Sequence, residues 1–514
     1  MKKRLASASA IALAILGSSS VHAQQQTQIE RFDRQLEGIR RNTRLQINPD
    51  VPVGERTYFD YGGYISASYL SLDSPSSAMT LTTTNPDGST NQTSVPASVH
   101  NTGLWQYELG FYSDVIFDNS NEFFFRGRLF QRDFNPGDRF NSEGEGIDGR
   151  IDRLFYKFDL AKFQGAYQGV EPKYDVSIKV GRDLVLWGNG LTLSTDMVGA
   201  VVDLAYDPLT LQLIAGVTPL DTTDFDSSRP RFDSRTERGL YGALGSVRVG
   251  EHRPYAYVLV QRDYNNDRLS STNPKDNIDG STAIDTRFHY DSHYIALGST
   301  GALTDRLSYG VEGVYEGGHT LSSPFVLGAD GSAVTVTQTR DHIEAWAVDG
   351  RLDYVLPDTH STRLSAEVLY ASGDSDRVSS TTATYGGNTP NTKDRAFNAF
   401  GLPDIGTAFS PSVSNLLMFR VGATSFPLSD IKPFRKMQLG TDLYFFAKAN
   451  TDAPIDEATT NSRWLGVEPD IYMNWQISSD VALSVRYGLF IPGDAITDDV
   501  KMRQFLFAGV TVSF

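Results

Sequence analysis

No cysteine occurs among the 514 residues of this chain. Disulfide frameworks and thiolate metal sites are therefore excluded. Acidic residues outnumber basic ones by 62 to 46, and the net charge of −16 argues against a nucleic-acid partner. After the N-terminal segment, the chain also lacks the roughly 20 consecutive apolar residues that a membrane-spanning helix needs. A membrane protein with this sequence must be a closed β-barrel, because hydrocarbon tolerates no open sheet edge.

Motifs of the common enzyme classes are missing as well. The sequence contains no Gly-x-Ser-x-Gly nucleophile elbow, no His-Glu-x-x-His zinc motif and no phosphate-binding glycine loop. We therefore expect no enzymatic activity and no cofactor. Asp374 and Asp376 could hold Ca²⁺ through carboxylate oxygens, but we favour the interpretation of a solvated acidic loop.

The first residues have the features of a secretory signal peptide. Lys2, Lys3 and Arg4 precede an apolar stretch over residues 6–16, and a small-residue cleavage site ends at Ala23. We predict that residues 1–23 are removed and that the mature protein is exported.

Residues 24–55 follow a different pattern. Ile29, Phe32, Leu36 and Ile39 are spaced by three and four residues, which predicts a short amphipathic periplasmic helix, followed by a proline-containing linker. Such a helix could lie against the mouth of a barrel. A short coiled-coil contact with itself or with a periplasmic partner is the alternative.

The C-terminal segment alternates between apolar and small or polar residues. One face carries Leu506, Ala508, Val510, Val512 and Phe514, and the other carries Gly509, Thr511 and Ser513. This is the pattern of a membrane β-barrel strand with its apolar face towards lipid. A terminal phenylalanine on such a strand is typical of bacterial outer-membrane proteins.

Similar alternation over residues 56–514 predicts an all-β transmembrane antiparallel barrel of about 18 strands. The clearest predicted strands cover residues 105–117, 123–132, 174–181, 209–217, 255–262, 307–315, 346–354, 364–370, 417–423, 437–447, 465–475, 481–489 and 506–514. Long loops are expected on one side only, at residues 72–101, 133–149, 263–286, 317–340, 372–412 and 450–463. A soluble β-sandwich is the rival fold, but its outer face would not be as apolar as the one that begins at Trp105 and ends at Phe117.

Strand parity also predicts which charged residues line the pore, because an arginine at the lipid-facing midplane costs about 2–4 kcal/mol. The predicted pore-lining and substrate-binding residues are Arg126, Arg128, Arg132, Lys179, Arg182, Arg248, Arg262, Arg351, Arg363, Arg420, Lys436, Arg486, Glu108, Asp349, Asp353, Glu468 and Asp470. Parity also sends Asp114, Glu312, Glu367 and Asp442 inward. Many of these charges could simply brace the wall. Arg126, Arg128 and Arg132 form a local excess, since no acid of the same parity lies between them, and unpaired guanidinium groups in a narrow pore attract anions.

Several segments resemble the alginate export family of outer-membrane barrels. They are residues 180–190 (VGRDLVLWGNG), 370–374 (YASGD), 394–397 (DRAF), 465–470 (LGVEPD) and 490–494 (FIPGD), in this order within a match from about Tyr58 to Phe514. The stretch 187–190 and the long loop from Ser372 resemble distant members more than the alginate exporters proper.

This resemblance implies a monomeric 18-stranded channel for passive export of an anionic exopolysaccharide along an arginine-rich constriction. The partners it implies are outer-membrane lipid, the polysaccharide itself and, as a candidate, a periplasmic scaffold protein. A general or anion-selective nutrient porin is the alternative function. The sequence names neither the polymer nor the direction of transport.

Overall fold

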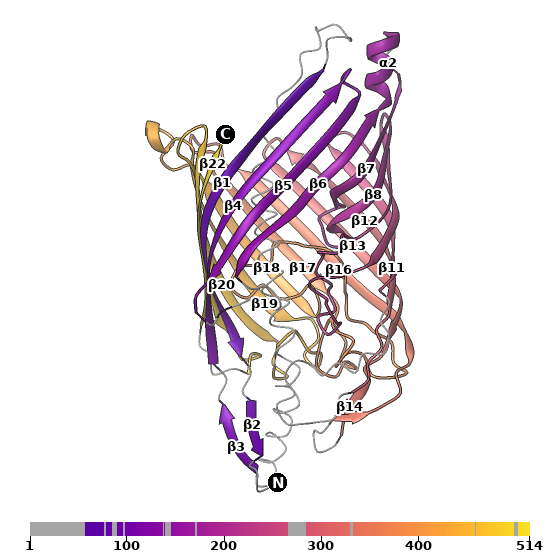
Figure 1. The fold of residues 1–514 in the computed structure, drawn as a ribbon, viewed down its shortest axis with the longest axis vertical. Helices are drawn as coiled ribbons and strands as arrows, with labels where there is room; N and C mark the ends of the chain where they lie inside the picture. The colour runs from indigo at the N-terminus through magenta and orange to yellow at the C-terminus, as the bar shows by residue number, and fades with distance from the viewer. Residues whose placement is uncertain are drawn as a thin grey trace.

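Eighteen antiparallel strands form a closed barrel in the computed structural model (Figure 1). The structure describes residues 57–76, 79–84, 90–95, 98–136, 138, 145–169, 172–265, 284–328, 333–457, 459–497 and 502–514. Closure occurs where the first strand pairs with both β4 and β22. The predicted fold is thus confirmed, whereas the signal peptide and the periplasmic helix predicted for residues 1–55 lie outside the described residues.

The barrel strands follow one another around the wall in chain order. They are β1 (Tyr58–Ser76), β4 (Ser98–Phe117), β5 (Asn121–Phe134), β6 (Gly146–Asp159), β7 (Tyr174–Leu186), β8 (Ser194–Tyr206), β9 (Leu209–Val217), β10 (Arg238–Val247), β11 (His252–Asp263), β12 (Tyr290–Thr304), β13 (Leu307–Leu321), β16 (Arg340–Val355), β17 (Arg363–Ala371), β18 (Leu416–Ser425), β19 (Met437–Lys448), β20 (Trp464–Gln476), β21 (Val481–Pro492) and β22 (Arg503–Ser513). The expected loop 72–101 is partly strand, since β1 and β4 extend into it and β2 (Met79–Thr84) pairs there with β3 (Thr90–Val95).

The two ends of the barrel differ. The C-terminus and the short turns lie at one end, together with α2 (Leu160–Gln168), whereas the β2–β3 hairpin and the hairpin of β14 (Phe325–Leu327) with β15 (Ala333–Thr335) lie at the other (Figure 1). Helix α2 begins where the Asp159 side chain accepts a hydrogen bond from the Lys162 backbone N–H and ends at Gly169 in the left-handed region. Short turns face the periplasm in barrels of this kind, so the end with the long loops is extracellular. Among the described residues, no α-helix has the length and apolarity that spanning a bilayer requires.

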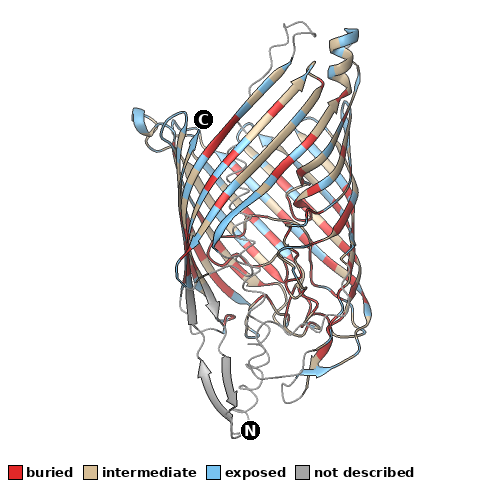
Figure 2. Cartoon of the chain, viewed as in Figure 1, coloured by how far each residue is buried: buried red, intermediate tan, exposed pale blue. Residues whose placement is uncertain are grey.

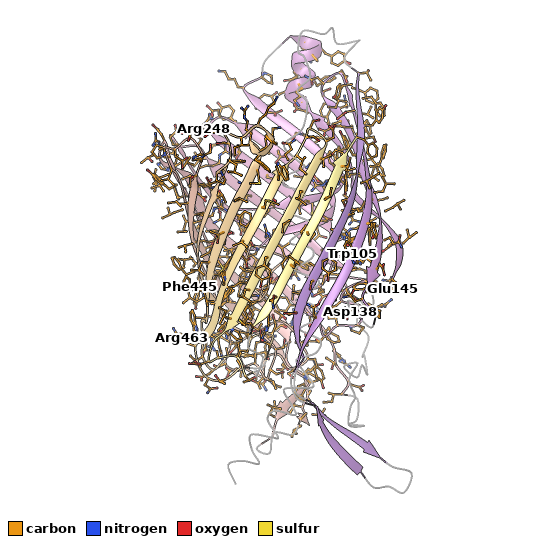
Figure 3. All side chains as sticks on the ribbon, turned by 90° about the vertical axis from the view of Figure 1, so that its left-hand side faces the viewer. Trp105, Asp138, Glu145, Arg248, Phe445 and Arg463 are labelled. Carbon is orange, nitrogen blue, oxygen red and sulfur yellow. The ribbon has the colours of Figure 1, made fainter. Side chains whose placement is uncertain are left out.

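Side chains alternate between the two faces of the wall. On β4, Trp105, Tyr107 and Leu109 are exposed on the outside, whereas Glu108 and Asp114 are buried. Figure 2 shows the same alternation of buried and exposed residues along the other strands, and Figure 3 shows Trp105 and Phe445 at the outer surface. The exposed apolar face is the one that lipid covers in a membrane.

One hairpin departs from the wall. The ladder between β6 and β7 ends at Leu154 and Arg182, and the ladder between β8 and β9 ends at Val198 and Val217. Beyond these points, β7 and β8 remain paired only with each other among the strands described, over residues 183–197. We call residues 183–197 the luminal hairpin, because its tip contacts inward-facing side chains of β11, β13 and β16.

A row of glycines marks the point of departure. Gly181 pairs with Gly199, which pairs with Gly216. A Cβ atom at Gly181 would overlap the Leu154 carbonyl oxygen, and one at Gly199 would overlap the Ala215 carbonyl oxygen. Gly181 also has a φ of 137°, which L-residues rarely adopt. The close approach of backbones here therefore needs residues without side chains.

We predict that Gly181→Ala destabilises the barrel by about 1–3 kcal/mol, because it combines backbone strain with a clash against a neighbouring strand. The measurement is the temperature at which the heat-modifiable band of the folded barrel disappears on an electrophoresis gel. Gly350→Ala in β16 is the matched control, since its Cβ would meet no atom within 4 Å. Equal effects of the two substitutions would contradict the proposed role of the glycine row.

Candidate functional site

A cavity of about 1080 Å³ occupies the lumen from the short-turn end inwards. Its lining follows one continuous arc of the wall, from β19 through β20, β21, β22, β1, β4, β5 and β6 to β7. Five basic and six acidic side chains line it: Arg126, Arg153, Lys157, Lys179, Lys436, and Asp60, Glu108, Asp114, Glu122, Asp183, Asp480. We call this space the luminal cavity.

The basic residues of the luminal cavity are concentrated on three adjacent strands. Arg126 lies on β5, Arg153 and Lys157 lie on β6, and Lys179 lies on β7. Arg126 is 3.5 Å from Asp152, and Lys179 donates a hydrogen bond of 2.6 Å to Asp183. These partners hold the cationic groups in place along one wall.

The part of the wall next to these three strands is acidic and phenolic. Asp60 lies on β1, and Glu108 and Asp114 lie on β4. The Tyr112 hydroxyl donates to Asp60 over 3.3 Å, and the Tyr64 hydroxyl donates to Glu108. Carboxylate and phenol oxygens can accept hydrogen bonds from the hydroxyl groups of a passing solute.

Aromatic rings run from the acidic strand β4 to the cationic strands β5 and β6. Tyr112 stacks on Phe124 with ring centroids 6.5 Å apart, and Phe124 stacks on Phe155 at 5.3 Å. The Lys179 ammonium lies 5.2 Å from the Phe155 ring centroid. The cavity therefore presents apolar rings beside cationic groups, which suits solutes that have both an apolar face and an anionic group.

The luminal hairpin and the loop 372–415 fill the extracellular half of the lumen. The luminal hairpin packs Trp187 against Tyr257, and the Asn189 side chain donates to Asp349 over 2.7 Å. The long loop 372–415 enters from the opposite side, where Phe397 and Phe409 are almost fully buried. Leu193 in the luminal hairpin forms a β-bridge with Phe400 of that loop.

Inward-facing carboxylates anchor the loop 372–415. Glu468 accepts hydrogen bonds from the backbone N–H groups of Thr407, Ala408 and Phe409, at 2.5, 2.7 and 2.8 Å. Glu316 accepts another from the Asn398 backbone at 2.8 Å. A carboxylate with several N–H donors makes charge-assisted hydrogen bonds, so the loop is held firmly against the wall.

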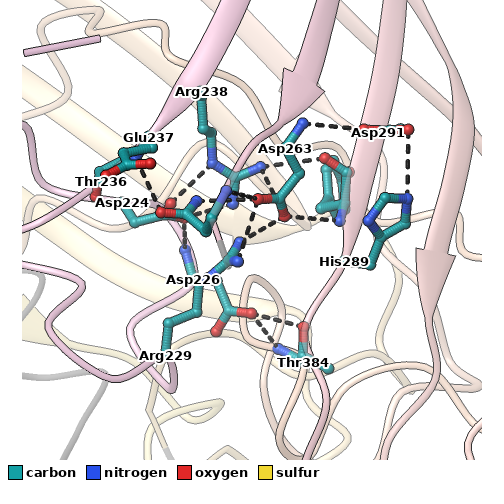
Figure 4. A network of polar contacts seen from close by, with 12 residues as sticks. Asp224, Asp226, Arg229, Thr236, Glu237, Arg238, Asp263, His289, Asp291 and Thr384 are labelled. Carbon is teal, nitrogen blue, oxygen red and sulfur yellow. Dashed lines mark hydrogen bonds and ion pairs between the residues drawn. The ribbon is translucent and has the colours of Figure 1, made fainter. Parts of the chain in front are cut away.

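A second cluster joins the loop 218–237 to the wall and to the loop 372–415 (Figure 4). Arg238 donates two hydrogen bonds of 2.8 Å to Asp224, and Arg229 is 2.7 Å from Asp263. Asp226 accepts hydrogen bonds from the backbone and hydroxyl groups of Thr384, at 3.0 and 2.6 Å. Burial raises the pKa of Asp226 above its usual range.

The loop 372–415 also has an internal ion pair. Arg377 is 2.7 Å from Asp394, and both side chains are almost inaccessible to solvent. Burial lowers the pKa of Arg377, but the Asp394 carboxylate more than offsets this, so its pKa is raised overall. The loop is thus a packed structural unit.

Residues 157–505 match the family model described as Alginate export, which covers more than half of the chain. The chain belongs to the alginate export family. This family consists of outer-membrane channels, and it is not an enzyme family. The predicted family is confirmed, although the match is shorter than the resemblance expected from about Tyr58 to Phe514.

Among solved structures, the chain is similar to three channels of Pseudomonas aeruginosa. OccK8 (OprE) has a TM-score of 0.49 at 11% identity, covering 90% of this chain and 99% of that one. OccK3 (OpdO) has a TM-score of 0.46 at 10% identity, covering 88% and 96%. OpdK, crystallised with vanillate, has a TM-score of 0.46 at 10% identity, covering 90% and 99%. A comparison with curated proteins finds no match.

Most of the charged residues predicted for the pore of this alginate export family member share the inner face of the wall. They are Arg126, Arg128, Arg132, Lys179, Arg351, Arg363, Arg420, Arg486, Glu108, Asp349, Asp353, Glu468 and Asp470. Lys436 lines the periplasmic rim of the luminal cavity. Their contact with a substrate stays a prediction.

Three predicted pore residues lie elsewhere. Arg248 is in the short turn between β10 and β11, where its exposed side chain pairs with Asp207 and lies at the opposite end of the barrel from Arg463 (Figure 3). Arg262 shares the outer face of β11 with Val258, at the extracellular end of the strand. Arg182 has the same parity as the exposed Val180 and therefore lies on the outer face of β7. The bend at Gly181 places Arg182 where β7 leaves the wall, and there it pairs with Asp196 and Asp221.

The predicted excess of unpaired arginines on β5 is wrong. Arg128 is 2.9 Å from Asp152 and 3.5 Å from Glu108, and Arg126 also contacts Asp152. Arg132 lies over the Phe130 ring, 4.8 Å from its centroid. Parity along β5 gives no information about acidic residues on β4 and β6. Glu108 and Asp152 on those strands are the partners of the arginines.

Sequence reasoning also missed two cavity residues, Arg153 and Lys157. Both lie on β6, and the pairing between β5 and β6 shifts register at Asp152, so that Asp152 is an extra residue in the strand. This bulge interrupts the alternation that would identify β6. The alternation Arg153, Leu154, Phe155 was the remaining sequence signal for the inner face of β6, since Leu154 is exposed outside and its two neighbours are buried.

The acidic loop considered for Ca²⁺ is engaged by protein groups. Asp374 accepts hydrogen bonds from the backbone N–H groups of Asp376 and Arg395, at 2.9 and 2.8 Å. Burial raises the pKa of Asp374. In the described part of the chain, no group of three or more His, Asp or Glu residues could hold a metal ion.

We predict that Glu468→Gln releases the loop segment 404–410, because an amide NH₂ replaces an oxygen that accepts a backbone N–H. Loss of these charge-assisted bonds should weaken loop docking by about 1.5–3 kcal/mol. Single-channel conductance should rise, and a protease added outside should cut the loop 372–415 faster. Glu344→Gln is the control, since it removes an exposed contact between β16 and Lys393 of the same loop. If both variants conduct like the wild type, Glu468 does not hold the loop in the pore.

Proposed function

We propose that this protein is a passive outer-membrane channel that exports an anionic, alginate-like polyuronate. The observation that carries the proposal is the row of four cations, Arg126, Arg153, Lys157 and Lys179, along one wall of the luminal cavity. Uronate carboxylates can exchange along such a row, because Arg126, Arg153 and Lys179 already pair with acidic residues and therefore bind a passing anion weakly. Conduction requires binding of this kind, strong enough for entry and weak enough for release.

The adjacent strands β1 and β4 support the same proposal. Sugar hydroxyl groups can donate to Asp60, Glu108 and Asp114, while the carboxylates of the polymer face the cations. A chain with anionic and hydroxyl groups on each unit matches this division better than a neutral chain does. The predicted partners, namely outer-membrane lipid, the polysaccharide and a periplasmic scaffold protein, fit an export channel that works as a monomer.

A small-anion nutrient channel is the second candidate. It is favoured by the loops and the luminal hairpin that fill the extracellular half of the lumen, since a polymer needs a wider path than a small solute. Export therefore requires that the loop 372–415 move, whereas uptake of small anions does not.

We predict that the triple variant Arg126→Gln, Lys157→Gln, Lys179→Gln weakens block of the reconstituted channel by soluble polyuronate about tenfold, which corresponds to 1.4 kcal/mol. Anion preference, measured as a reversal potential across a salt gradient, should fall as well. A neutral polymer of equal length should block neither protein.

The control variant Arg248→Gln, Arg262→Gln, Arg463→Gln removes the same number of positive charges from outside the luminal cavity. It should retain the wild-type block. If polyuronate and the neutral polymer block the wild type equally, the proposal of polyuronate export fails and the nutrient channel replaces it.

A further inference from the structure

The wall between β6 and the luminal hairpin is joined by side chains. The backbone ladder of β6 with β7 covers only Leu154 to Asp159, whereas its ladder with β5 continues to Gly146. On the far side, β9 ends at Val217. We call this part of the wall the seam, bounded by residues 146–153 of β6, by residues 182–186 and 194–198 of the luminal hairpin and its base, and by the loop residues 218–221.

Ion pairs close the seam. Arg150 of β6 is 2.8 Å from Asp221 and 3.5 Å from Asp196. Arg182 is 2.9 Å from Asp221 and 3.4 Å from Asp196. The two guanidinium groups and the two carboxylates thus form a four-membered cluster across the seam. Its side chains are 15–39% exposed, so the cluster lies near the surface of the wall.

The seam is located at membrane depth. Its β6 edge carries Ile147 and Ile151 on the outer face, and these are 77% and 46% exposed. Leu220, in the loop on the other side, is 53% exposed. Exposed aliphatic side chains on both margins are suited to contact with lipid chains.

On its inner side, the seam adjoins the luminal cavity. Arg153, Asp183 and Leu184 line that cavity. Arg153 of β6 and Asp183 of β7 form an ion pair at the point where the β6–β7 ladder ends. Behind them lie Phe155 and Lys179. Separation of the side-chain pairs would therefore connect a partly aromatic, partly cationic cavity with the apolar outer surface.

A backbone ladder and an ion-pair closure differ in how they open. Separating paired strands in hydrocarbon leaves N–H and C=O groups without partners, at a cost of several kcal/mol each. Ion pairs between side chains can instead exchange their partners for water of the luminal cavity, which the seam residues Arg153 and Asp183 line, or for an incoming anion, without disturbing the ladder of the barrel. The seam is thus the part of this wall that can open locally.

We propose that the seam is a lateral passage, through which single-chain amphiphiles with an anionic head group move between the outer leaflet and the luminal cavity. The acyl chain enters between the aliphatic margins, and the head group exchanges with Asp196 and Asp221 on Arg150 and Arg182. Inside, Arg153 and Lys179 receive the head group and the aromatic rings receive the chain. This route is separate from the axial path of the proposed polysaccharide export.

The absence of native cysteine allows a direct test. Arg150→Cys and Asp221→Cys place thiols on both margins, and a short bis-maleimide can link them, since two contacting long side chains hold their Cβ atoms further apart than the roughly 4 Å that a disulfide bridges. The probe is cis-parinaric acid, a fluorescent fatty acid, added to full-length protein in lipid nanodiscs. Binding is followed by energy transfer from tryptophan.

We expect saturable binding of parinarate that is at least fivefold faster in the unlinked double-cysteine variant than after linking. The methyl ester of the probe should bind at least tenfold more weakly than the acid. Arg248→Cys with Asp207→Cys, linked in the same way, is the matched control, since it joins another arginine–aspartate pair in the periplasmic turns. Linking there should leave the binding rate unchanged.

Equal binding rates before and after linking at the seam would overturn the lateral passage, as would equal binding of the acid and its ester. Axial conductance and its block by polyuronate are measured on the same samples. Both should be unchanged by linking at the seam. Loss of conductance in parallel with loss of binding would show that the link obstructs the lumen, and would also overturn the proposal. Failure of the polyuronate block alone would concern only the export function.

Discussion

Hydrocarbon offers no hydrogen-bond partner to a peptide group, and the whole structure depends on the sheet being closed. Closure is made between the two ends of the barrel sequence, where β22 pairs with β1 from Tyr64 to Leu72. Phe514 completes it, because its backbone exchanges two hydrogen bonds of 2.9 Å with Gly63. Once the register of this joint is set, every residue of β1 and β22 is assigned either to lipid or to the lumen.

The same constraint gives the inward charges their role. A lumen lined by side chains of both signs must pair most of them, and the structure does so with residues of neighbouring strands and of the loops. Glu316 and Glu468 have parity towards the lumen, yet their oxygens accept backbone N–H groups of the loop 372–415. Charges near the extracellular end therefore hold the loops in place, whereas those of the luminal cavity remain accessible for solutes.

Alternation was sufficient to predict the fold and the inner face of the regular strands, because Trp105 to Phe117 or Leu506 to Phe514 repeat strictly every second residue. It could not predict features that break this period. The extra residue Asp152 interrupts the alternation of β6, so Arg153 and Lys157 were not predicted. The bend at Gly181 places Arg182 at the end of the β6–β7 ladder and not in the pore. Arg248 and Arg262 were misplaced because parity carries no information at the ends of strands. Contacts between strands, such as Arg128 with Asp152, need the register of two strands at once.

The breaks in the period coincide with the features proposed to carry function. The bulge at Asp152 brings Asp152 and Arg153 inward together, which adds the cation Arg153 to the luminal cavity and gives Arg126 and Arg128 an acidic partner. At the next strand, the glycine row lets β7 and β8 leave the wall, and the luminal hairpin then narrows the lumen. The seam beside it is closed by ion pairs between side chains. A barrel whose ladder were regular at these positions would have neither the inserted hairpin nor the side-chain closure. Selectivity in the lumen and access from the side therefore have a common origin, because both follow from the end of the β6–β7 ladder at Leu154 and Arg182.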